Sequence, residues 1–318
     1  MATILVVDIG GTNIRFSIVQ DGKIGEVTKY KNTEFNNPLE AFDLYLSNCP
    51  NSPSYMILGV AGPVSDGQAT LTNRKWSFNE TEFEKRYNLI KCQLVNDFVL
   101  KGYGTLDLTA DDYITLNNVK SVKNAPKCVI GPGTGLGVCF LTYASGEWTA
   151  HPTEAGHTDI SSNGLAQQKI LKHLRPKGNN ISAEEILSGR GLVTLYHSIC
   201  ALNHQLPLTS IPEGVLELAL ENNKGALEAY KYFFEFLGTF AGNMAITMKC
   251  LGGVYITSSI LRHEKIEKLF LKSSFQKAFC NRGKMTLLAT SIPIFYITRS
   301  KLAFLGLKKL AQHIEKSI

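Results

Sequence analysis

Two glycine-rich segments, each placed directly after a short aliphatic run, constrain the fold of this chain more than any other feature. The run Ile4 to Val7 leads into the sequence DIGGT at residues 8–12. About half a chain later, Cys128 to Ile130 leads into GPGTG at residues 131–135. Strand-like residues resume after each segment, so each segment predicts a glycine hairpin between two strands. The recurrence predicts a duplicated unit.

The remaining elements follow from the spacing of apolar residues and from turn and cap signals. Asp21-Gly22 predicts a hairpin turn, and Asn79 followed by Glu82 predicts the start of a helix. Further strands are expected at 16–19, 55–60, 94–95, 136–143, 254–256 and 292–297, and helices after Pro38 and at 165–174, 183–187, 192–202, 215–220, 226–248 and 302–314. The polar stretch 109–127 has no strong periodicity. Strands first and then strands alternating with helices, in two copies, predict an α/β chain with mixed sheets flanked by helices.

Length and charge narrow the class of protein. A chain of 318 residues, 44% hydrophobic and 19% charged, can bury about 75% of its extended-chain surface without disulfides or metals. Its length predicts two domains. The net charge of +6 is spread along the chain, which favours small anionic ligands over nucleic acid.

The pattern of cysteines and the lack of signal-peptide or membrane-span features predict a cytoplasmic protein. The seven cysteines form no CxxC pair and no zinc-spaced cluster, as expected for reduced thiols. The first residues lack the features of a signal peptide. The apolar stretch Leu237 to Ile256 is interrupted by Asn243, Lys249 and Gly252-Gly253, so it predicts a core helix followed by a core strand and no membrane span.

The two glycine segments suit phosphate groups, because glycine lets backbone amides approach an anion closely. Neither segment is a GxxxxGK phosphate loop, and neither fits the dinucleotide fingerprint. Either segment alone could be a tight hairpin without a ligand. The presence of both, one in each half, favours phosphate binding.

These residues resemble the bacterial glucokinase family, which belongs to the superfamily of actin, hexokinase and Hsp70. Asp8 to Asn13 is similar to that family's first phosphate loop, Gly131 to Gly137 to its second, and Leu251 to Ile256 to the approach to its adenosine loop. The resemblance runs nearly end to end and includes Ala61-Gly62-Pro63, Thr72-Asn73 with Trp76, Leu94 to Phe98, Glu154 to His157, and Ser182-Ala183-Glu184 leading to Leu187-Ser188-Gly189.

The resemblance implies a two-lobed, actin-like (RNase H-like) ATPase fold. The small N-terminal lobe would span 1–110, with a C-terminal helix at about 301–318 packing back on it, and the large lobe would span 111–300. The implied activity is that of a cytoplasmic glucokinase, which transfers phosphate from ATP to the 6-hydroxyl of D-glucose and yields glucose 6-phosphate. A homodimer is expected, with no nucleic-acid or membrane partner.

Phosphoryl transfer to an alcohol needs a base near the hydroxyl, and Asp97 follows the predicted strand end at Leu94-Val95. By resemblance Asp97 is the catalytic base; the alternative role is a cap of the following helix. Sugar hydroxyls call for carboxylates, amides and imidazoles. The expected sugar-binding residues are Asn96, Asp97, Glu154, His157 and Glu184. Taken alone, His157 would be a satisfied histidine and Glu184 an exposed residue of a first helical turn.

The expected nucleotide-binding residues are Asp8, Gly10, Gly11, Thr12, Asn13, Gly131, Gly133, Thr134 and Gly135. Asp8 is the candidate for holding Mg²⁺ through water, since this ion needs only one or two carboxylates. The related repressor and sugar-kinase group carries a cysteine-rich zinc motif after its counterpart of His157. Here residues 158–161 lead into a cysteine-free segment, which indicates the zinc-free type.

The chain departs from the family pattern at its nucleotide end. Relatives have a small residue and two glycines where this chain has Thr257-Ser258-Ser259, and the segment 298–309 carries Arg299, Lys301, Lys308 and Lys309 in place of a glycine-rich helix start. Two alternatives therefore stay open: a non-catalytic hexose sensor with a degraded nucleotide site, and a kinase for another acceptor such as an amino sugar. The intact catalytic and sugar motifs favour a kinase.

Overall fold

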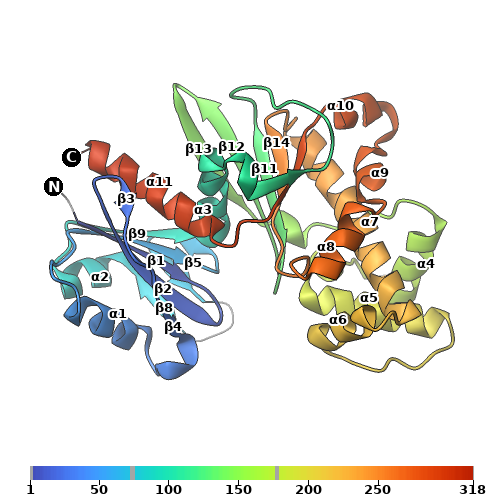
Figure 1. Cartoon of the computed structure of the whole chain (residues 1–318), viewed down its shortest axis with the longest axis horizontal. Helices are drawn as coiled ribbons and strands as arrows, with labels where there is room; N and C mark the ends of the chain where they lie inside the picture. The colour runs from blue at the N-terminus through green and yellow to red at the C-terminus, as the bar shows by residue number, and fades with distance from the viewer. Residues whose placement is uncertain (1–2, 72–75, 176–178, 318) are drawn as a thin grey trace. The chain divides into compact units, whose positions relative to one another are not determined.

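The computed structural model describes residues 3–71, 76–175 and 179–317 of the chain. Thr72 and Asn73, which belong to one of the matching motifs, lie outside the described residues. The chain forms two compact units (Figure 1). The first comprises Met1–Leu108 and Arg299–Ile318, and the second Thr109–Thr298.

The first unit is built on a six-stranded sheet. Its strands are β1 (Ile4–Ile9), β2 (Asn13–Gln20), β3 (Lys23–Ile24), β4 (Thr28–Lys31), β5 (Tyr55–Val60) and β9 (Lys91–Asn96), in the order β3-β2-β1-β5-β9, with β4 paired to β2. β1 pairs antiparallel with β2 and parallel with β5, which in turn pairs parallel with β9. The turn between β2 and β3 has positive φ at Asp21 and Gly22, which confirms the predicted hairpin turn.

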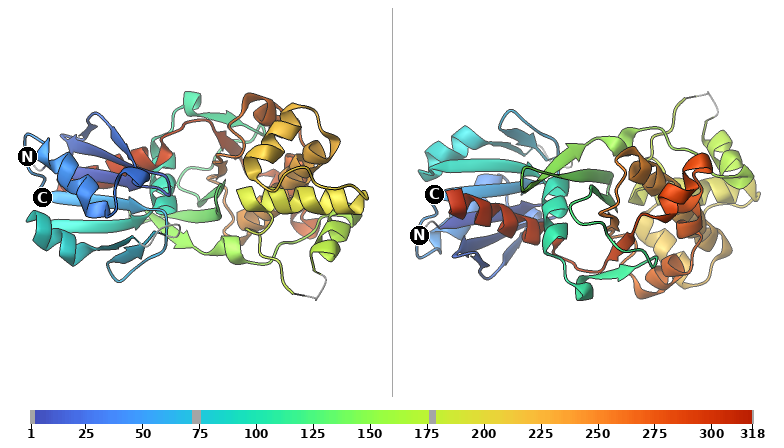
Figure 2. Two further views of the ribbon diagram at one scale, coloured as in Figure 1. Left: turned by 90° about the horizontal axis from the view of Figure 1, so that it is seen from below. Right: turned by 90° about the horizontal axis from the view of Figure 1, so that it is seen from above.

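Helices cover both faces of this sheet (Figures 1 and 2). α1 (Pro38–Ser47) and α2 (Glu80–Tyr87) cover one face, and α3 (Asp97–Gly104) and α11 (Leu302–Ser317) cover the other. The Asn79 side chain accepts a hydrogen bond from Glu82 N at 3.1 Å, so the predicted cap of α2 is confirmed. A small sheet of β6 (Val64–Ser65), β7 (Gln68–Thr70) and β8 (Ser77–Asn79) completes the unit, with 3-10 turns at Asn32–Glu34 and Thr105–Asp107.

α3 and α11 cross at two glycines. A side chain on Gly306 would collide with the backbone of Leu100, and one on Gly104 with the backbone of Leu302. The two helices are therefore in backbone contact, which fixes the C-terminal helix against the helix that begins at Asp97.

The second unit repeats the sheet of the first. Its strands are β10 (Tyr113–Thr115), β11 (Lys127–Pro132), β12 (Leu136–Ala144), β13 (Glu147–Thr153), β14 (Gly253–Ile256) and β15 (Ile294–Ile297), in the order β10-β15-β14-β11-β12-β13. As in the first unit, an antiparallel meander (β11 to β13) is joined to two parallel strands (β14 and β15). The predicted duplication is thus confirmed in the strand order.

The second unit also contains helices. They are α4 (Leu165–Leu174), α5 (Gly189–Leu202), α6 (Pro212–Leu220), α7 (Lys224–Thr247), α8 (Glu264–Leu271), α9 (Phe275–Cys280) and α10 (Thr286–Thr290), with 3-10 turns at Ala110–Asp112, Ala155–His157 and Gly283–Met285. Of these helices, α7 contacts strand β11 of the sheet, while α5, α6 and α9 pack against α7 and α4 packs against α5. The stretch Leu237 to Ile256 is the end of the largely buried α7 followed by the fully buried β14, which confirms the prediction of a core helix and a core strand. Among the described residues, no helix is both long and apolar enough to cross a membrane.

The helix predicted at 183–187 is wrong, because these residues form turns. Their amides bond to another segment: Ala183 N donates to Thr158 O and Glu184 N to Gly156 O, both at 2.8 Å. Strands β6 to β8, β10 and β13 and helices α8 to α10 were not predicted. β13 is an edge strand with exposed and partly exposed residues and a proline at position 152, so it lacks the apolar run typical of a buried strand.

Candidate active site

The hairpin between β1 and β2 carries a charged pair. Asp8, near the end of β1, lies opposite Arg15 on β2, and Arg15 Nη1 donates to Asp8 Oδ2 at 2.8 Å. Burial raises the pKa of the Asp8 carboxyl, and this effect outweighs the opposing influence of Arg15. The negative charge of Asp97 also raises the pKa of Asp8, so the two carboxylates are close enough to interact.

The loop of this hairpin is held by a residue that the sequence analysis missed. Asn32 is buried; its Nδ2 donates to Gly10 O at 2.8 Å and its backbone N donates to Thr12 O at 2.9 Å. Within the loop, Gly10 N donates to Asn13 O at 3.0 Å. Asn32 follows a polar strand 20 residues further along the chain, and no local pattern in the sequence points from it to the loop.

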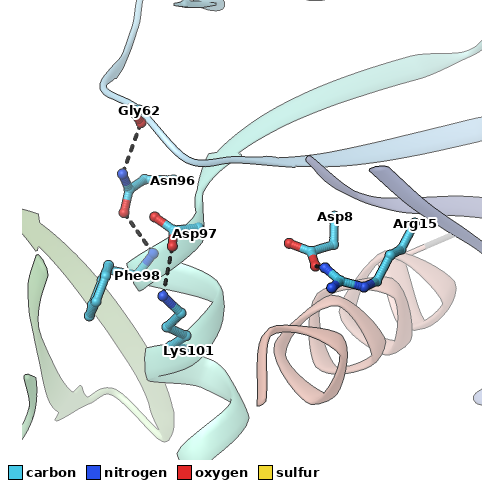
Figure 3. A network of polar contacts seen from close by, with 7 residues as sticks. All are labelled: Asp8, Arg15, Gly62, Asn96, Asp97, Phe98 and Lys101. Atoms are coloured by element: carbon cyan, nitrogen blue, oxygen red, sulfur yellow. Dashed lines mark hydrogen bonds and ion pairs between the residues drawn. The ribbon is translucent and has the colours of Figure 1, made fainter. Parts of the chain in front are cut away.

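Asp97 is the first residue of α3 and directly follows β9 (Figure 3). Asn96 caps the helix: its Oδ1 accepts from Phe98 N at 2.8 Å, while its Nδ2 donates to Gly62 O at 2.9 Å. The capping role that was one alternative for Asp97 therefore belongs to Asn96. The Asp97 carboxylate accepts a hydrogen bond from Lys101 Nζ at 2.7 Å through Oδ2.

The hairpin between β11 and β12 is connected to two other motifs of the second unit. Glu184 accepts from Leu136 N through Oε2 at 2.9 Å and donates from its own N to Gly156 O. A side chain on Gly135 would come within 2.5 Å of Glu184 Oε2, and one on Gly156 would collide with the carbonyl oxygen of Leu136. Close approach to backbone therefore requires glycine at position 156, which has no positive φ, whereas a side chain at position 135 would displace the carboxylate of Glu184.

Glu154 and His157 lie at one turn beside this hairpin. His157 N donates to Glu154 O at 3.0 Å, and His157 Nε2 is 3.8 Å from Glu154 Oε2. The two side chains are 76% and 61% exposed. Both polar groups are thus available to a ligand, whereas one carboxylate oxygen of Glu184 is engaged by the hairpin.

A cavity of about 470 Å³ adjoins the tip of the second hairpin. It is lined by Gly133, Thr134, Arg190, Glu213, Ser259 and His263, together with other residues from α5, α6 and α7. Apolar walls with a few polar groups suit a nucleotide. The cavity, the glycine tip and the end of β14 all belong to the second unit.

The two serines that depart from the family pattern have different surroundings. Ser258 is buried; its Oγ donates to Pro132 O at 2.8 Å and accepts from Ile260 N at 3.1 Å. Ser259 lines the cavity. Of the two added hydroxyls, the first therefore joins the second hairpin to the loop after β14, and the second faces the space where a ligand would lie.

One of the C-terminal cations noted in the sequence has a partner in the structure. Lys309 Nζ pairs with Asp107 Oδ1 at 3.1 Å, so this lysine has a structural partner. Among the described residues, no group of three or more histidine, cysteine or acidic side chains could hold a metal. A small hydrated ion such as Mg²⁺ does not need such a group, and Asp8 offers a largely buried carboxylate whose other oxygen does not bind Arg15.

The sequence-predicted residues fall into two sets, each within one unit. The first set is Asp8, Gly10, Gly11, Thr12, Asn13, Asn96 and Asp97, at the ends of β1 and β9. The second set is Gly131, Gly133, Thr134, Gly135, Glu154, His157 and Glu184. Each set combines a glycine hairpin with carboxylates, which is an arrangement suited to phosphate and hydroxyl groups.

Comparisons with known proteins agree with this arrangement. The family model described as glucokinase matches residues 5–314. The chain is 33% identical to the glucokinase of Photorhabdus laumondii over 305 residues, covering 95% of this chain and 94% of the relative. It is also 33% identical to the glucokinase of Paramagnetospirillum magneticum over 312 residues, covering 96% and 97%.

Solved structures show the same fold. The glucokinase from an Antarctic psychrotroph superposes with a TM-score of 0.89 at 27% identity, covering 98% of this chain and 99% of that one. The glucokinase of Balamuthia mandrillaris, solved with glucose, gives 0.81 at 23% identity, covering 98% and 94%. The fold is thus the actin-like fold of the sugar kinases, and the chain belongs to the glucokinase family.

Proposed function

We propose that this chain is an ATP-dependent glucokinase that uses Asp97 as its base. Family membership over nearly the whole chain supports the activity. The observation that carries the residue assignment is the position of Asp97 at the first turn of α3, with one carboxylate oxygen bound by Lys101 and the other not bound by it.

The reaction needs little covalent work from the protein. Asp97 takes the proton from the 6-hydroxyl of glucose as that oxygen forms a bond to the γ-phosphorus of ATP. The bond between this phosphorus and the bridging oxygen of ADP breaks, and ADP leaves with the electron pair. A base of this kind contributes about 10²- to 10⁴-fold to the rate.

The residues that bind the substrates are part of the same proposal. Asn96, Asp97, Glu154, His157 and Glu184 would bind the sugar hydroxyls. The tips of the two glycine hairpins would bind the phosphates, and the cavity beside Gly133 would hold the nucleoside. Asp8 would hold Mg²⁺ through water, and the bound ion supplies positive charge to the phosphates.

The two alternatives are not favoured. A sensor with a degraded nucleotide site would be expected to have lost the cavity at the second hairpin, but the cavity of about 470 Å³ is present. A kinase for another acceptor finds no support among the glucokinase relatives.

A coupled assay of ADP production over a panel of hexoses, amino sugars and nucleotides tests the activity. We expect turnover with glucose and ATP and much lower kcat/KM with acceptors that lack one hydroxyl, because unpaired buried polar groups are costly. Glucose binding without turnover on any nucleotide would contradict the proposal and support the sensor.

Asp97→Asn tests the residue assignment. We expect kcat to fall by about 10²- to 10⁴-fold with little change in glucose affinity, measured by calorimetry. Asp107→Asn is the matched control, because Asp107 is also paired to a lysine within the first unit. Near-normal turnover of Asp97→Asn would remove Asp97 from the role of base.

We also propose a homodimer in the cytoplasm, without a nucleic-acid or membrane partner. The seven cysteines, all of them described, are free thiols, and five of them are buried, which suits a reducing compartment. Light scattering coupled to gel filtration tests the dimer: a monomer mass of 35.0 kDa at assay concentrations would contradict it.

A further inference from the structure

The helix that begins with the proposed base also provides its partner. Lys101 lies four residues after Asp97, one turn along α3, and its Nζ donates to Asp97 Oδ2 at 2.7 Å (Figure 3). Within the described part of the chain, Lys101 is the one donor to this carboxylate. The Lys101 and Asp97 side chains are only 25% and 21% exposed, so the pair is less screened by water than a surface pair.

Lys101 is itself held in place. Its ammonium lies 3.8 Å from the centroid of the Phe98 ring, within the range of a cation–π contact. The backbone that carries this ring is anchored to the helix cap, because Phe98 N donates to Asn96 Oδ1 at 2.8 Å. The cap, the ring, the ammonium and the carboxylate therefore form one continuous set of contacts over the first turns of α3.

This arrangement assigns different tasks to the two carboxylate oxygens of Asp97. Oδ2 is occupied by Lys101, so Oδ1 is the oxygen that can accept a proton. A carboxylate free to rotate about its χ angles would present Oδ1 for only part of the time, and misorientation of a catalytic group by about 1 Å can cost about 10²-fold in rate.

We propose that Lys101 is a positioning residue for phosphoryl transfer, which holds Oδ2 of Asp97 so that Oδ1 faces the acceptor hydroxyl. This inference rests on the proposed function. Lys101 keeps its own proton throughout: the proton of the 6-hydroxyl moves to Oδ1, the new bond forms at the γ-phosphorus, and ADP departs. Asp8 on β1, which is paired with Arg15 on β2, also interacts electrostatically with Asp97 and Lys101.

Steady-state kinetics of Lys101→Met and Lys101→Arg test this role. Methionine preserves an apolar stem over Phe98 but removes the cation, so we expect kcat to fall about tenfold to a hundredfold while KM for glucose stays within about twofold. Arginine restores the donor, so kcat should return to within about threefold of the wild-type value. Lys309→Met is the matched control, because Lys309 also pairs with an aspartate in the first unit, and it should leave both parameters unchanged.

A double variant separates positioning from a general structural effect. If Lys101 acts through Asp97, adding Lys101→Met to Asp97→Asn should cause almost no further loss of kcat, whereas independent roles would give multiplicative losses. All assays are run well below the melting temperature of each variant. Lys101→Gln, which keeps a polar donor, provides a second replacement if the methionine variant is poorly folded.

Specific results would overturn the inference. These are an unchanged or increased kcat in Lys101→Met, equal losses in the methionine and arginine variants, or multiplicative losses in the double variant. The failure of the proposed function has a different signature, since a wild-type protein without turnover on any hexose would defeat both. An active wild type that loses turnover in Asp97→Asn but not in Lys101→Met defeats the role of Lys101 alone.

Discussion

The two units share one strand order but carry different chemistry at the equivalent position of their first hairpins. In the first unit, the pair just before the last pair of the hairpin is Asp8 opposite Arg15. In the second, the same place is occupied by Gly131 opposite Gly137. The same strand arrangement can therefore carry a charged pair of side chains in one unit and a pair of glycines in the other.

The difference extends to the segments that hold each hairpin. The first hairpin is held by Asn32, which binds its carbonyl groups. The second is held by Glu184 and Ser258, which bind the backbone on either side of its tip. In the first unit, the carboxylates proposed to act in the reaction lie at strand ends. In the second unit, segments far along the chain bind the hairpin backbone, and the glycines let other segments come close to it.

The largest expected effect is at the charged pair of the first unit. Asp8→Asn should reduce kcat by about a hundredfold or more, because the proposed holder of Mg²⁺ is lost. It should also leave the protein as stable or more stable, by up to about 1 kcal/mol, since burial raises the pKa of Asp8 and thus disfavours its charged form. Kinetics at several Mg²⁺ concentrations and thermal unfolding measure both effects. A large loss of stability would show that the pair with Arg15 is structural.

The raised pKa of Asp8 also predicts how the stability effect of Asp8→Asn depends on pH. Because the pKa of Asp8 is raised in the folded state, its contribution favours folding below its unfolded value of 3.8 and is lost as pH rises through the folded pKa. The gain in unfolding free energy from Asp8→Asn should therefore be larger at pH 7 than at acidic pH. Denaturant unfolding at both pH values tests this, and the reverse order would contradict it.

The second-largest effect is expected in the second unit, where a glycine lies against the backbone of the hairpin. Gly156→Ala places a methyl group against the carbonyl of Leu136, so it should destabilise the protein by about 1–3 kcal/mol. Gly146→Ala serves as a control for space, because nothing lies within 4 Å of its added carbon, although the positive φ there adds strain. Chemical denaturation measures both variants. Because Gly156 has no positive φ, its loss would come from close approach alone, and a loss below about 0.5 kcal/mol would show that the chain around Leu136 relaxes to admit the methyl group.

The two serines near the second hairpin should respond differently. Ser258→Gly removes two buried hydrogen bonds and should cost about 1–2 kcal/mol of unfolding free energy. Ser259→Gly, which only enlarges the cavity, should leave stability almost unchanged and alter KM for ATP by about threefold. Equal effects of the two variants on KM for ATP would contradict the distinction between the two hydroxyls.

The smallest effect is expected from the loss of a helix cap, and it should be equal in the two units. Asn79 caps α2 in the first unit and Asn223 caps α7 in the second, each accepting a backbone hydrogen bond at 3.1 and 3.0 Å. Replacement of either by alanine should cost about 1 kcal/mol. Calorimetric thermal unfolding of the two variants measures the loss; a single transition in each would show that the units unfold together, and two transitions that they unfold separately.

Local patterns in the sequence predicted most of the fold. The hairpins, the Asn79 cap, strand β5 at Tyr55–Val60 and helix α4 at Leu165–Leu174 depend on apolar spacing and turn residues, and the structure confirms them. The turns at 183–187 were predicted as a helix because the bonds of these amides to Gly156 and Thr158 are not visible in the sequence.

The candidate site was only partly accessible from the sequence. Asp97 and Asn96 could be located because a strand end and a helix start coincide there. The contacts of Asn32 with Gly10 and of Glu184 with Leu136 depend on tertiary structure. The pairing of Lys101 with Asp97 has the spacing of a helical turn and could have been found from it. The assignment of Glu154 and His157 to the sugar stays a prediction.

The backbone contact between α3 and α11 has a consequence for synthesis on the ribosome. One face of the first sheet is covered by α11, which is made some two hundred residues after β9. Until then, the emerging domain exposes apolar strand residues and the glycine surface of α3, so its completion must wait while the second domain is translated. Nascent-chain truncations before Leu302 should therefore be the forms that chaperones retain.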